Sequence, residues 1–290
     1  MDHLDTENDY RLTLKDIQDI SLDILSDVHH FCMENGIRYS LAYGTLIGAI
    51  RHHGFIPWDD DADIMMPRAD YLRFCQTYRS DRFRIISEYD ADSYIQYARI
   101  YDCRDTRNTS YAVRSKNPEE GVWIDVFPLD GAEDDHEAFL ARIKKMYRLR
   151  LRQVRLRDAK ADISKAEDVR KKLRLLGKKI IYLNGAFLRL VNRCMFKTAQ
   201  EIPFGSTAHW SSYTSVEDGH WEYQLTEDFT DTVPVIFEGR EFRMCNGYDR
   251  VLRNYYGDYM QLPPKEEQEP KHVFQSFIWK SGRRPLPTRD

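Results

Sequence analysis

The chain has 290 residues, of which 42% are hydrophobic and 31% are charged, the composition of a globular protein with a sizeable core. Its formal net charge of −4 gives no overall signal for nucleic-acid binding. The five cysteines are scattered and form no C-x-x-C pair, so neither a disulfide framework nor a zinc knuckle is expected.

The two sequence features that report on location agree. The first residues, MDHLDTENDYR, are acidic and polar and do not have the character of a secretory signal. No apolar run approaches the roughly 20 residues that cross a bilayer. The best candidate, residues 180–196, is interrupted by Asn184, Arg189 and Arg193. We therefore expect a cytoplasmic protein.

The first predicted helix begins after Thr13. Thr13 is a good N-cap and Asp16 follows three residues later, which is the pattern of a capping box. Apolar residues then recur at helical spacing as far as Gly36, which is expected to end the helix. His29 and His30 lie near this end, where the helix dipole favours cations, and we interpret both as structural.

The most informative stretch reads LAYGTLIGAIRHHGFIPWDDDADIMM. Its pattern predicts a strand over 38–43, a tight turn at Gly44–Thr45 and a short helix through 47–50. A second turn is expected at His53–Gly54, and a second strand begins near Asp61.

The acidic end of this stretch suggests a metal site. Because side chains alternate along a strand, Asp59, Asp61 and Asp63 would share one face. Carboxylates that lie so close repel one another, and a divalent cation removes the cost. Hard oxygen ligands suit Mg²⁺ (or Mn²⁺). The plain alternative is a solvated acidic turn, but the acids run directly into the apolar segment 64–66, which must be buried.

At this motif the chain resembles a known family. GTLIGAIRHHGFIPWDDDADIMM is similar to the signature of the LicD phosphotransferases, bacterial phosphocholine transferases to which the fukutin-related ribitol-phosphate transferases are related. The wider pattern resembles the nucleotidyltransferase superfamily. This resemblance implies that Gly44 and Thr45 lie against the substrate phosphates and that Asp61 and Asp63 hold the metal. It also implies an α/β (α+β) fold with a nucleotidyltransferase-like mixed β-sheet core flanked by helices.

Beyond the motif, a helix is expected from Pro67, followed by three β-like runs over 83–89, 94–101 and 109–113. Arg99 lies between two apolar residues of the second run. A charge at such a position is either a snorkelling edge residue or a phosphate ligand directed into a cleft. The family resemblance favours the phosphate ligand.

The segment GVWIDVFPLDG places Asp125 within an otherwise apolar strand. Burying an unpaired charge is costly, so this carboxylate needs a metal, a salt bridge or a hydrogen-bonded cap. WIDVFPLDG resembles the corresponding LicD-family segment, which implies that Asp125 is a third metal ligand beside Asp61 and Asp63. Asp130–Gly131 is predicted to be a turn.

The next region is helical and strongly basic. Residues 138–197 contain 19 Lys and Arg against four Asp and Glu, a net charge of +15, and the remainder of the chain has a net charge of −19. Two or three long helices are expected, with a hinge over 158–164. The basic face is either simply solvated or attracts anionic lipid head groups or polyanionic acceptors. No nucleic-acid motif accompanies the charge.

Aromatic residues gather in the segment 203–222. Because Trp and Tyr hold quaternary ammonium groups such as choline by cation–π contacts, Trp210, Tyr213 and Trp221 are candidates for a substrate wall. The same residues are equally typical of core or loop packing.

The C-terminal part begins with a predicted β-hairpin over 233–237 and 240–244, joined at Glu238–Gly239, and a helix over 248–256 follows. The run from FEGREF through YDRVLRNYYGDYMQLPP resembles the LicD C-terminal region. His272 matches a histidine that the family tends to place after the double proline. The resemblance therefore implies that His272 contacts phosphate or acts as a base.

We therefore predict three parts. Residues 1–133 form the nucleotidyltransferase-like catalytic core, and 134–200 form a basic helical insertion. Residues 201–290 complete the core and the substrate cleft and end in an extended tail.

The function implied by the resemblance is metal-dependent transfer of phosphocholine from CDP-choline to a sugar hydroxyl of a teichoic-acid or lipopolysaccharide precursor, with release of CMP. Asp61, Asp63 and Asp125 would hold the ion on the diphosphate. Arg51 and Arg99 are the best candidates for phosphate clamps. A carboxylate or His52 would take the proton of the acceptor, although His52 and His53 could equally be loop residues.

Other functions fit the same residues. Transfer of another polyol phosphate from a CDP-linked donor, of ribitol or glycerol, would need the same carboxylates. In a nucleotidyltransferase reaction the acceptor would attack the α-phosphate instead. The non-enzymatic alternative is an inactive adaptor at a membrane surface, against which the full carboxylate set argues. The expected partners are a CDP-linked donor, a lipid-linked or oligosaccharide acceptor, and a membrane surface contacted peripherally through the basic helices. Nucleic acid is not expected.

Overall fold

The computed structural model describes residues 11–90, 95–109, 120–157, 186–214, 222–270 and 276–280, together with 168, 170, 173 and 282. The chain forms two compact units. The first comprises Met1–Ser87, Tyr97–Pro128 and Glu227–Asp290, and the second comprises Glu88–Gln96 and Leu129–Thr226. Of the predicted C-terminal part 201–290, residues up to 226 therefore belong to the second unit and the rest to the first.

The first unit opens with helix α1 (Leu14–Asn35), which confirms the predicted capping box. The Thr13 Oγ1 atom accepts a hydrogen bond from the Asp16 N–H, and the Asp16 carboxylate accepts one from the Thr13 N–H. Gly36 ends the helix with φ of 59°, a left-handed conformation that glycine adopts without steric cost. His29 Nδ1 lies 2.6 Å from the hydroxyl oxygen of Tyr39, which places His29 in the packing of this helix.

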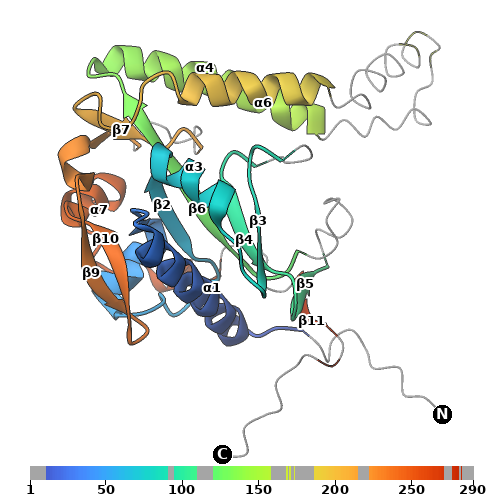
Figure 1. The fold of residues 1–290 in the computed structure, drawn as a ribbon, viewed down its shortest axis with the longest axis vertical. Coiled ribbons are helices and arrows are strands. Elements are labelled where there is room, and N and C mark those ends of the chain that lie inside the picture. The colour runs from blue at the N-terminus through green and yellow to red at the C-terminus, as the bar shows by residue number, and fades with distance from the viewer. Residues whose placement is uncertain are drawn as a thin grey trace, which may run out of the picture. The chain divides into compact units, whose positions relative to one another are not determined.

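The sheet of the first unit has the strand order β1-β2-β6-β4-β3. Strand β1 (Ser40–Leu41) pairs antiparallel with β2 (Asp63–Pro67), and β4 (Ala98–Asp102) pairs antiparallel with β3 (Phe83–Ile86) and β6 (Trp123–Ala132). Helix α3 (Arg68–Thr77) packs against β2, and α1 packs against β4 (Figure 1). A short separate pair joins β5 (Thr106–Asn108) to β11 (Phe277–Trp279).

The core of the first unit is strongly apolar around β4, the strand that contains Arg99. Strand β4 is buried at all five positions, and its Ile100 is the register partner of Ile124 on the neighbouring strand β6. Ile64 of β2 is also fully buried. Each such aliphatic side chain contributes about 1.5–3 kcal/mol of transfer free energy. Arg99, in the middle of β4, shares this buried environment.

The predicted hairpin and helix near the C-terminus are confirmed. Strands β9 (Thr232–Phe237) and β10 (Arg240–Cys245) pair antiparallel, and α7 (Tyr248–Tyr256) follows. Glu238 and Gly239 both have positive φ, of 49° and 72°, as a two-residue hairpin turn requires. The Glu238 carboxylate accepts a hydrogen bond of 3.0 Å from the Phe55 N–H. The hairpin turn therefore supports the loop that follows the helix predicted through 47–50.

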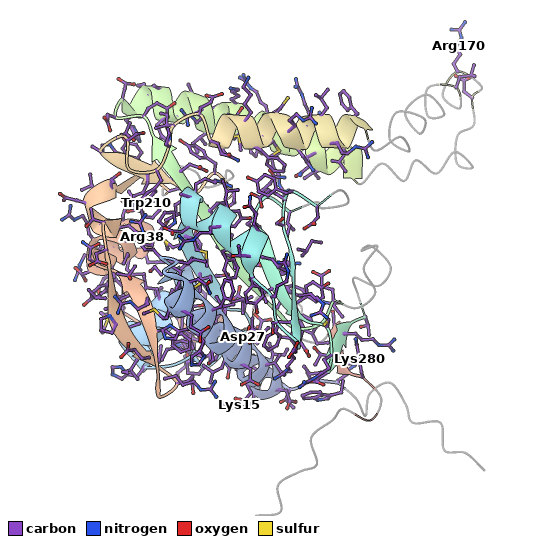
Figure 2. The ribbon with its side chains drawn as sticks, viewed as in Figure 1. Lys15, Asp27, Arg38, Arg170, Trp210 and Lys280 are labelled. Carbon is purple, nitrogen blue, oxygen red and sulfur yellow. The ribbon has the colours of Figure 1, made fainter. Side chains whose placement is uncertain are left out.

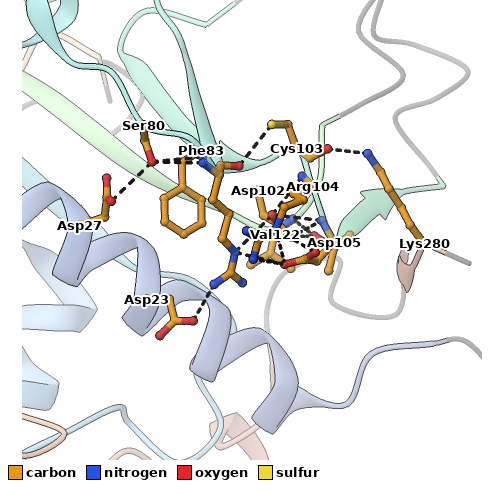
Figure 3. A network of polar contacts seen from close by, with 12 residues as sticks. Asp23, Asp27, Ser80, Phe83, Asp102, Cys103, Arg104, Asp105, Val122 and Lys280 are labelled. Atoms are coloured by element: carbon orange, nitrogen blue, oxygen red, sulfur yellow. Dashed lines mark hydrogen bonds and ion pairs between the residues drawn. The ribbon is translucent and has the colours of Figure 1, made fainter. Parts of the chain in front are cut away.

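A network of ion pairs ties α1 to the ends of β3 and β4 (Figure 3). The Arg82 guanidinium lies 2.8 Å from Asp23, 3.6 Å from Asp102 and 3.2 Å from Asp105. Asp102 is fully buried and also accepts a hydrogen bond of 2.8 Å from the hydroxyl of Thr106. This half-buried arginine therefore compensates buried negative charge at the end of the sheet.

The second unit contains the long helices α4 (His136–Arg157) and α6 (Ala186–Ala199), which lie side by side (Figure 1). Their shared core includes Phe139, Met146, Val191 and Met195, and the Gln153 side-chain amide donates a hydrogen bond of 2.8 Å to Asn192. The hinge predicted over 158–164 lies outside the described residues. Strand β7 (His209–Ser211) pairs antiparallel with the end of β6, and β8 (Gln224–Leu225) pairs antiparallel with β7. Within the described part of the chain, no helix combines the length and apolar character needed to span a bilayer.

The short 3₁₀ segments are η4 (Thr226–Phe229) and η5 (Lys265–Glu267).

One local prediction, the turn at Asp130–Gly131, was wrong. Asp130–Gly131 is not a turn but part of β6, where Gly131 pairs with Trp210 of β7. A Cβ atom on Gly131 would lie 2.5 Å from the Pro203 carbonyl oxygen, so the glycine serves a close backbone approach and not a reversal of the chain.

Candidate functional site

The motif folds as a helix with an unusual start. The predicted strand over 38–43 is shorter, and Gly44–Thr45 is not a separate turn but the beginning of α2 (Tyr43–Ile47), which continues as the π-helical segment η2 (Gly48–His52). Tyr43 makes the change of direction, because its φ is 45°. Positive φ in a bulky residue is strained and is often found at functional sites. The expected turn after the helix is confirmed, with φ of 57° at His53.

The acidic run behaves as the alternation predicts, although β2 itself begins only at Asp63. Asp60, Ala62 and Ile64 are buried, whereas the three alternate residues, Asp59, Asp61 and Asp63, are half-buried. A Cβ atom on Gly44 would lie 2.8 Å from Asp59 Oδ2, so this carboxylate packs closely against the start of α2. The alternate carboxylates of the run therefore lie together beside the motif helix.

Thr45 fixes the position of the acidic strand. Its Oγ1 atom accepts a hydrogen bond of 2.9 Å from the Asp63 N–H, and the Asp63 carbonyl accepts one of 3.0 Å from the Ala42 N–H. The Thr45 side chain is buried, so no water replaces its hydroxyl. The threonine predicted to face the substrate phosphates thus also holds the backbone of a candidate metal ligand.

Replacing Thr45 with valine, which has the same shape, is expected to lower the free energy of unfolding by about 1–3 kcal/mol, because it leaves the part-buried Asp63 N–H without its acceptor. Thr45→Ser keeps the hydroxyl and should cost less. Chemical denaturation of both variants measures the difference. Equal losses in the two would mean that the hydrogen bond contributes nothing and that only the lost packing of the side chain matters.

Asp125 comes to the same place from β6. Its N–H donates a hydrogen bond of 3.0 Å to the carbonyl of Ala62, between Asp61 and Asp63. Burial raises the pKa of the Asp63 carboxyl well above its usual value, and the negative charges of Asp61 and Asp125 raise it further. The three acids predicted from two separate segments of sequence therefore lie close enough to interact.

Arg99 supplies positive charge to this group. Its Nε donates a hydrogen bond of 2.9 Å to Asp125 Oδ1, its Nη1 lies 3.1 Å from Glu120 Oε1, and its guanidinium lies 4.0 Å from the ring centroid of Trp123. Burial opposes the charged form, yet Asp125 and Glu120 raise the pKa of Arg99 well above its usual value. Because the side chain is only 4% exposed, its charge serves the protein's own carboxylates in this arrangement.

Arg51 and His52 lie at the end of η2. The Arg51 guanidinium donates hydrogen bonds of 2.7 Å and 3.2 Å to the carbonyls of Tyr259 and Gln261, and its Nε donates one of 2.9 Å to His52 Nε2. Burial, and then the charge of Arg51, lower the pKa of His52. Arg51 thus fastens the segment after α7 to the motif, and His52 is neutral at pH 7.

The donor atoms suit a hard divalent ion, since all three candidate ligands are carboxylates on adjacent backbone. Among the described residues, however, no three His, Cys, Asp or Glu side chains are arranged in the geometry of a metal site. Asp125 directs Oδ1 to Arg99, so it would bind an ion through its second oxygen. The chemistry therefore fits Mg²⁺, and binding would need the side chains of Asp61, Asp63 and Asp125 to turn toward one ion.

Two residues of the predicted aromatic wall, Trp210 and Tyr213, are described by the structure. Trp210 of β7 and Tyr213 belong to the second unit and are 0% and 2% exposed (Figure 2). A cation–π wall needs an accessible ring face, and neither ring presents one in this structure. Trp221 and His272 lie outside the described residues.

Comparison with known proteins identifies the family of the chain. Residues 36–150 match the family model described as LicD/FKTN/FKRP, nucleotidyltransferase domain. The chain is 34% identical over 275 residues to the lipopolysaccharide cholinephosphotransferase LicD of Haemophilus influenzae, which covers 92% of this chain and 99% of that protein. The chain belongs to the LicD family. This membership confirms the predicted family and makes the protein a transferase with a nucleotidyltransferase-like α/β core.

Two shorter matches are to proteins of Rickettsia. The chain is 43% identical over 53 residues to the uncharacterized protein RT0683 of Rickettsia typhi, covering 18% of this chain and 17% of that protein. It is 34% identical over 85 residues to the uncharacterized protein RP689 of Rickettsia prowazekii, covering 29% of each. The LicD family model, over residues 36–150, spans the acidic run, Arg99 and Asp125 together.

Glu120 is the residue of this LicD-family site that sequence reasoning missed. It is 3% exposed and pairs with Arg99, which in turn pairs with Asp125. The sequence does carry a signal, because Glu119 and Glu120 directly precede the apolar strand that contains Asp125. What the sequence does not carry is the register that places Arg99 opposite Asp125.

Proposed function

We propose that the protein transfers phosphocholine from CDP-choline to a sugar hydroxyl of a cell-surface glycan precursor, of lipopolysaccharide or teichoic-acid type, and releases CMP. The observation that carries the proposal is the near full-length match to a relative named lipopolysaccharide cholinephosphotransferase. The carboxylate group of Asp61, Asp63 and Asp125, assembled from two segments, supports it independently.

In this reaction the acceptor hydroxyl oxygen attacks the phosphorus that carries choline. The bond from that phosphorus to the bridging oxygen breaks, CMP leaves with the electron pair, and the hydroxyl proton passes to a base. Asp61, Asp63 and Asp125 would hold Mg²⁺ (or Mn²⁺), which would neutralise charge on the diphosphate and stabilise the leaving CMP.

The other residues of the site have narrower roles in this proposal. Thr45 and the start of α2 hold Asp63 in place, and the hydrogen bond from Arg99 orients the Asp125 carboxylate. His52 is neutral, but its Nε2 lone pair already accepts a hydrogen bond from Arg51. A carboxylate of the acidic group is therefore the better candidate for the base. Arg51 would act on the donor only after releasing the Tyr259 and Gln261 carbonyls.

The test is to incubate the purified protein and Mg²⁺ with CDP-choline, CDP-ribitol and CDP-glycerol in turn and to measure CMP. We expect CMP from CDP-choline, through transfer or slow hydrolysis, and its loss when EDTA is added. A nucleotidylated product would mean nucleotidyl transfer instead. If no donor is consumed, and wild type and the Asp61→Asn and Asp63→Asn variants bind Mg²⁺ with equal affinity, the adaptor function is favoured.

Peripheral membrane contact remains part of this proposal. Lys144, Arg148, Arg152 and Arg155 recur along the exposed side of α4, and Arg189, Arg193 and Lys197 along that of α6. Half-exposed or exposed apolar residues, Tyr147, Phe187 and Leu190, lie on the same two helices. Basic helices with apolar side chains between the charges are typical of surfaces that bind anionic lipid head groups. Such a contact would bring the enzyme to lipid-linked acceptors.

A further inference from the structure

The first unit contains a group of aromatic rings beside the carboxylates that nothing in the sequence motif singles out. Tyr43, Tyr97, Phe127 and Tyr255 come from four different places in the chain and belong to this one unit. The Tyr43 and Phe127 ring centroids are 5.2 Å apart, Tyr43 and Tyr255 are 5.3 Å apart, and Tyr97 and Phe127 are 4.8 Å apart. We call these four residues the aromatic group.

The aromatic group lies beside the acidic residues of the site and Arg99. Tyr97 places its hydroxyl 3.5 Å from Nη2 of Arg99, the same guanidinium that holds Asp125. Tyr43 immediately precedes Gly44, against which Asp59 packs. Phe127 follows Asp125 by two residues on β6, so the two side chains leave the strand on the same face. A ligand whose phosphate meets the carboxylates would thus have these rings within reach.

The rings are not ordinary core residues. Only Phe127 is buried, at 8% exposure, and the three tyrosines around it are half-buried. Half-buried tyrosines leave part of the ring surface accessible to a ligand, whereas Tyr39 and Tyr71 of the same unit are closed off in the core.

Tyr43 is held in a strained conformation. Its φ of 45° puts a bulky residue in the left-handed region, which costs about 1–2 kcal/mol. Its ring contacts the rings of Phe127 and Tyr255, at interplanar angles of 90° and 62°. Strained backbone conformations persist only where the surrounding structure enforces them, and they are found most often at active sites and ligand-binding sites.

We propose that the aromatic group is the subsite for the quaternary ammonium of the donor, with Tyr43 and Tyr255 as its principal ring walls. This inference rests on the proposed function and deepens it. A trimethylammonium group cannot donate a hydrogen bond and is recognised by the negative faces of aromatic rings, at about 0.5–2 kcal/mol for each ring. A neutral polyol such as glycerol gains nothing from such faces, so the group selects among CDP-linked donors.

The experiment compares a charged and a neutral donor on the full-length protein. KM for CDP-choline is measured from CMP release, and CDP-glycerol is measured in the same assay as a substrate or, where it does not react, as a competitive inhibitor. Tyr43→Leu and Tyr255→Leu should each raise KM for CDP-choline roughly tenfold, which is about 1.4 kcal/mol. The constant for CDP-glycerol should change less than twofold. Tyr43→Phe keeps the ring and should restore the wild-type KM.

Phe31→Leu is the matched control, because Phe31 is a half-buried ring of the same unit that packs on Phe74 and Tyr78. It should leave the constants for both donors unchanged. Equal rises for CDP-choline and CDP-glycerol in the Tyr43 and Tyr255 variants would overturn the subsite and leave the proposed function standing. Absence of CMP release from CDP-choline by the wild-type protein would overturn the proposed function itself.

Discussion

Asp63→Asn is expected to lose at least about a thousandfold of transfer activity while the folded protein becomes no less stable. Asparagine has the same shape, but it removes the carboxylate at the centre of the acidic group, where burial, Asp61 and Asp125 all disfavour negative charge. In metal-free buffer at pH 7 the substitution relieves that repulsion, so the thermal midpoint should stay equal or rise. CMP release and thermal unfolding in EDTA measure the two effects.

Asp60→Asn is the matched control for this experiment. It makes the same chemical change three residues away, but Asp60 is buried on the opposite side of the acidic run. Its activity should stay within about tenfold of wild type, measured on the fraction that is folded. If the Asp60 and Asp63 variants lose activity equally, the acidic run supports the fold and the individual positions carry no separate catalytic role.

The opposite effects on activity and stability have a physical reason. A structural salt bridge stabilises both the fold and the function, so its removal harms both. A group of like charges held together in advance for a ligand weakens the fold and is useful only when the ligand is bound. The response of Asp63 therefore separates a binding group from a structural one without a structure of the complex.

Local patterns in the sequence predicted the parts of the fold that depend on neighbouring residues. The capping box at Thr13, the stop at Gly36 and the hairpin turn at Glu238–Gly239 are each specified within about four residues, and the structure confirms them. The alternation along the acidic run is equally local, because it follows from the period of an extended chain.

The remaining features depend on contacts between distant segments. Nothing near Arg99 in the sequence states that β4 pairs with β6 in the register that places Asp125 opposite it. The predicted phosphate ligand is therefore found paired with Asp125 and Glu120, and its role toward phosphate stays a prediction. The aromatic group is equally distant in sequence, because its rings come one at a time from four separate segments, and no local pattern brings them together.

The second large effect is expected at Arg99. Arg99→Met should lower the free energy of unfolding by about 3–5 kcal/mol, because it leaves the buried Glu120 and the half-buried Asp125 carboxylates without their cation. Chemical denaturation in EDTA measures the loss. Glu120→Gln should cost less, and the double variant Arg99→Met/Glu120→Gln should be more stable than the sum of the single losses predicts, since one uncompensated charge has been removed.

Adding Mg²⁺ to the Arg99→Met variant tests whether Asp125, the carboxylate that Arg99 compensates, also binds the ion. If Asp125 also binds the ion, added Mg²⁺ should recover part of the stability lost in Arg99→Met, by more than it stabilises wild type. Arg82→Met is the control, because Arg82 likewise compensates the buried Asp102 and the half-buried Asp105 at the other end of the sheet (Figure 3). That variant should be destabilised with no such recovery. An equal response of both variants to Mg²⁺ would contradict the assignment of Asp125 to the metal, because it would show that the ion acts on the protein as a whole and not through this carboxylate.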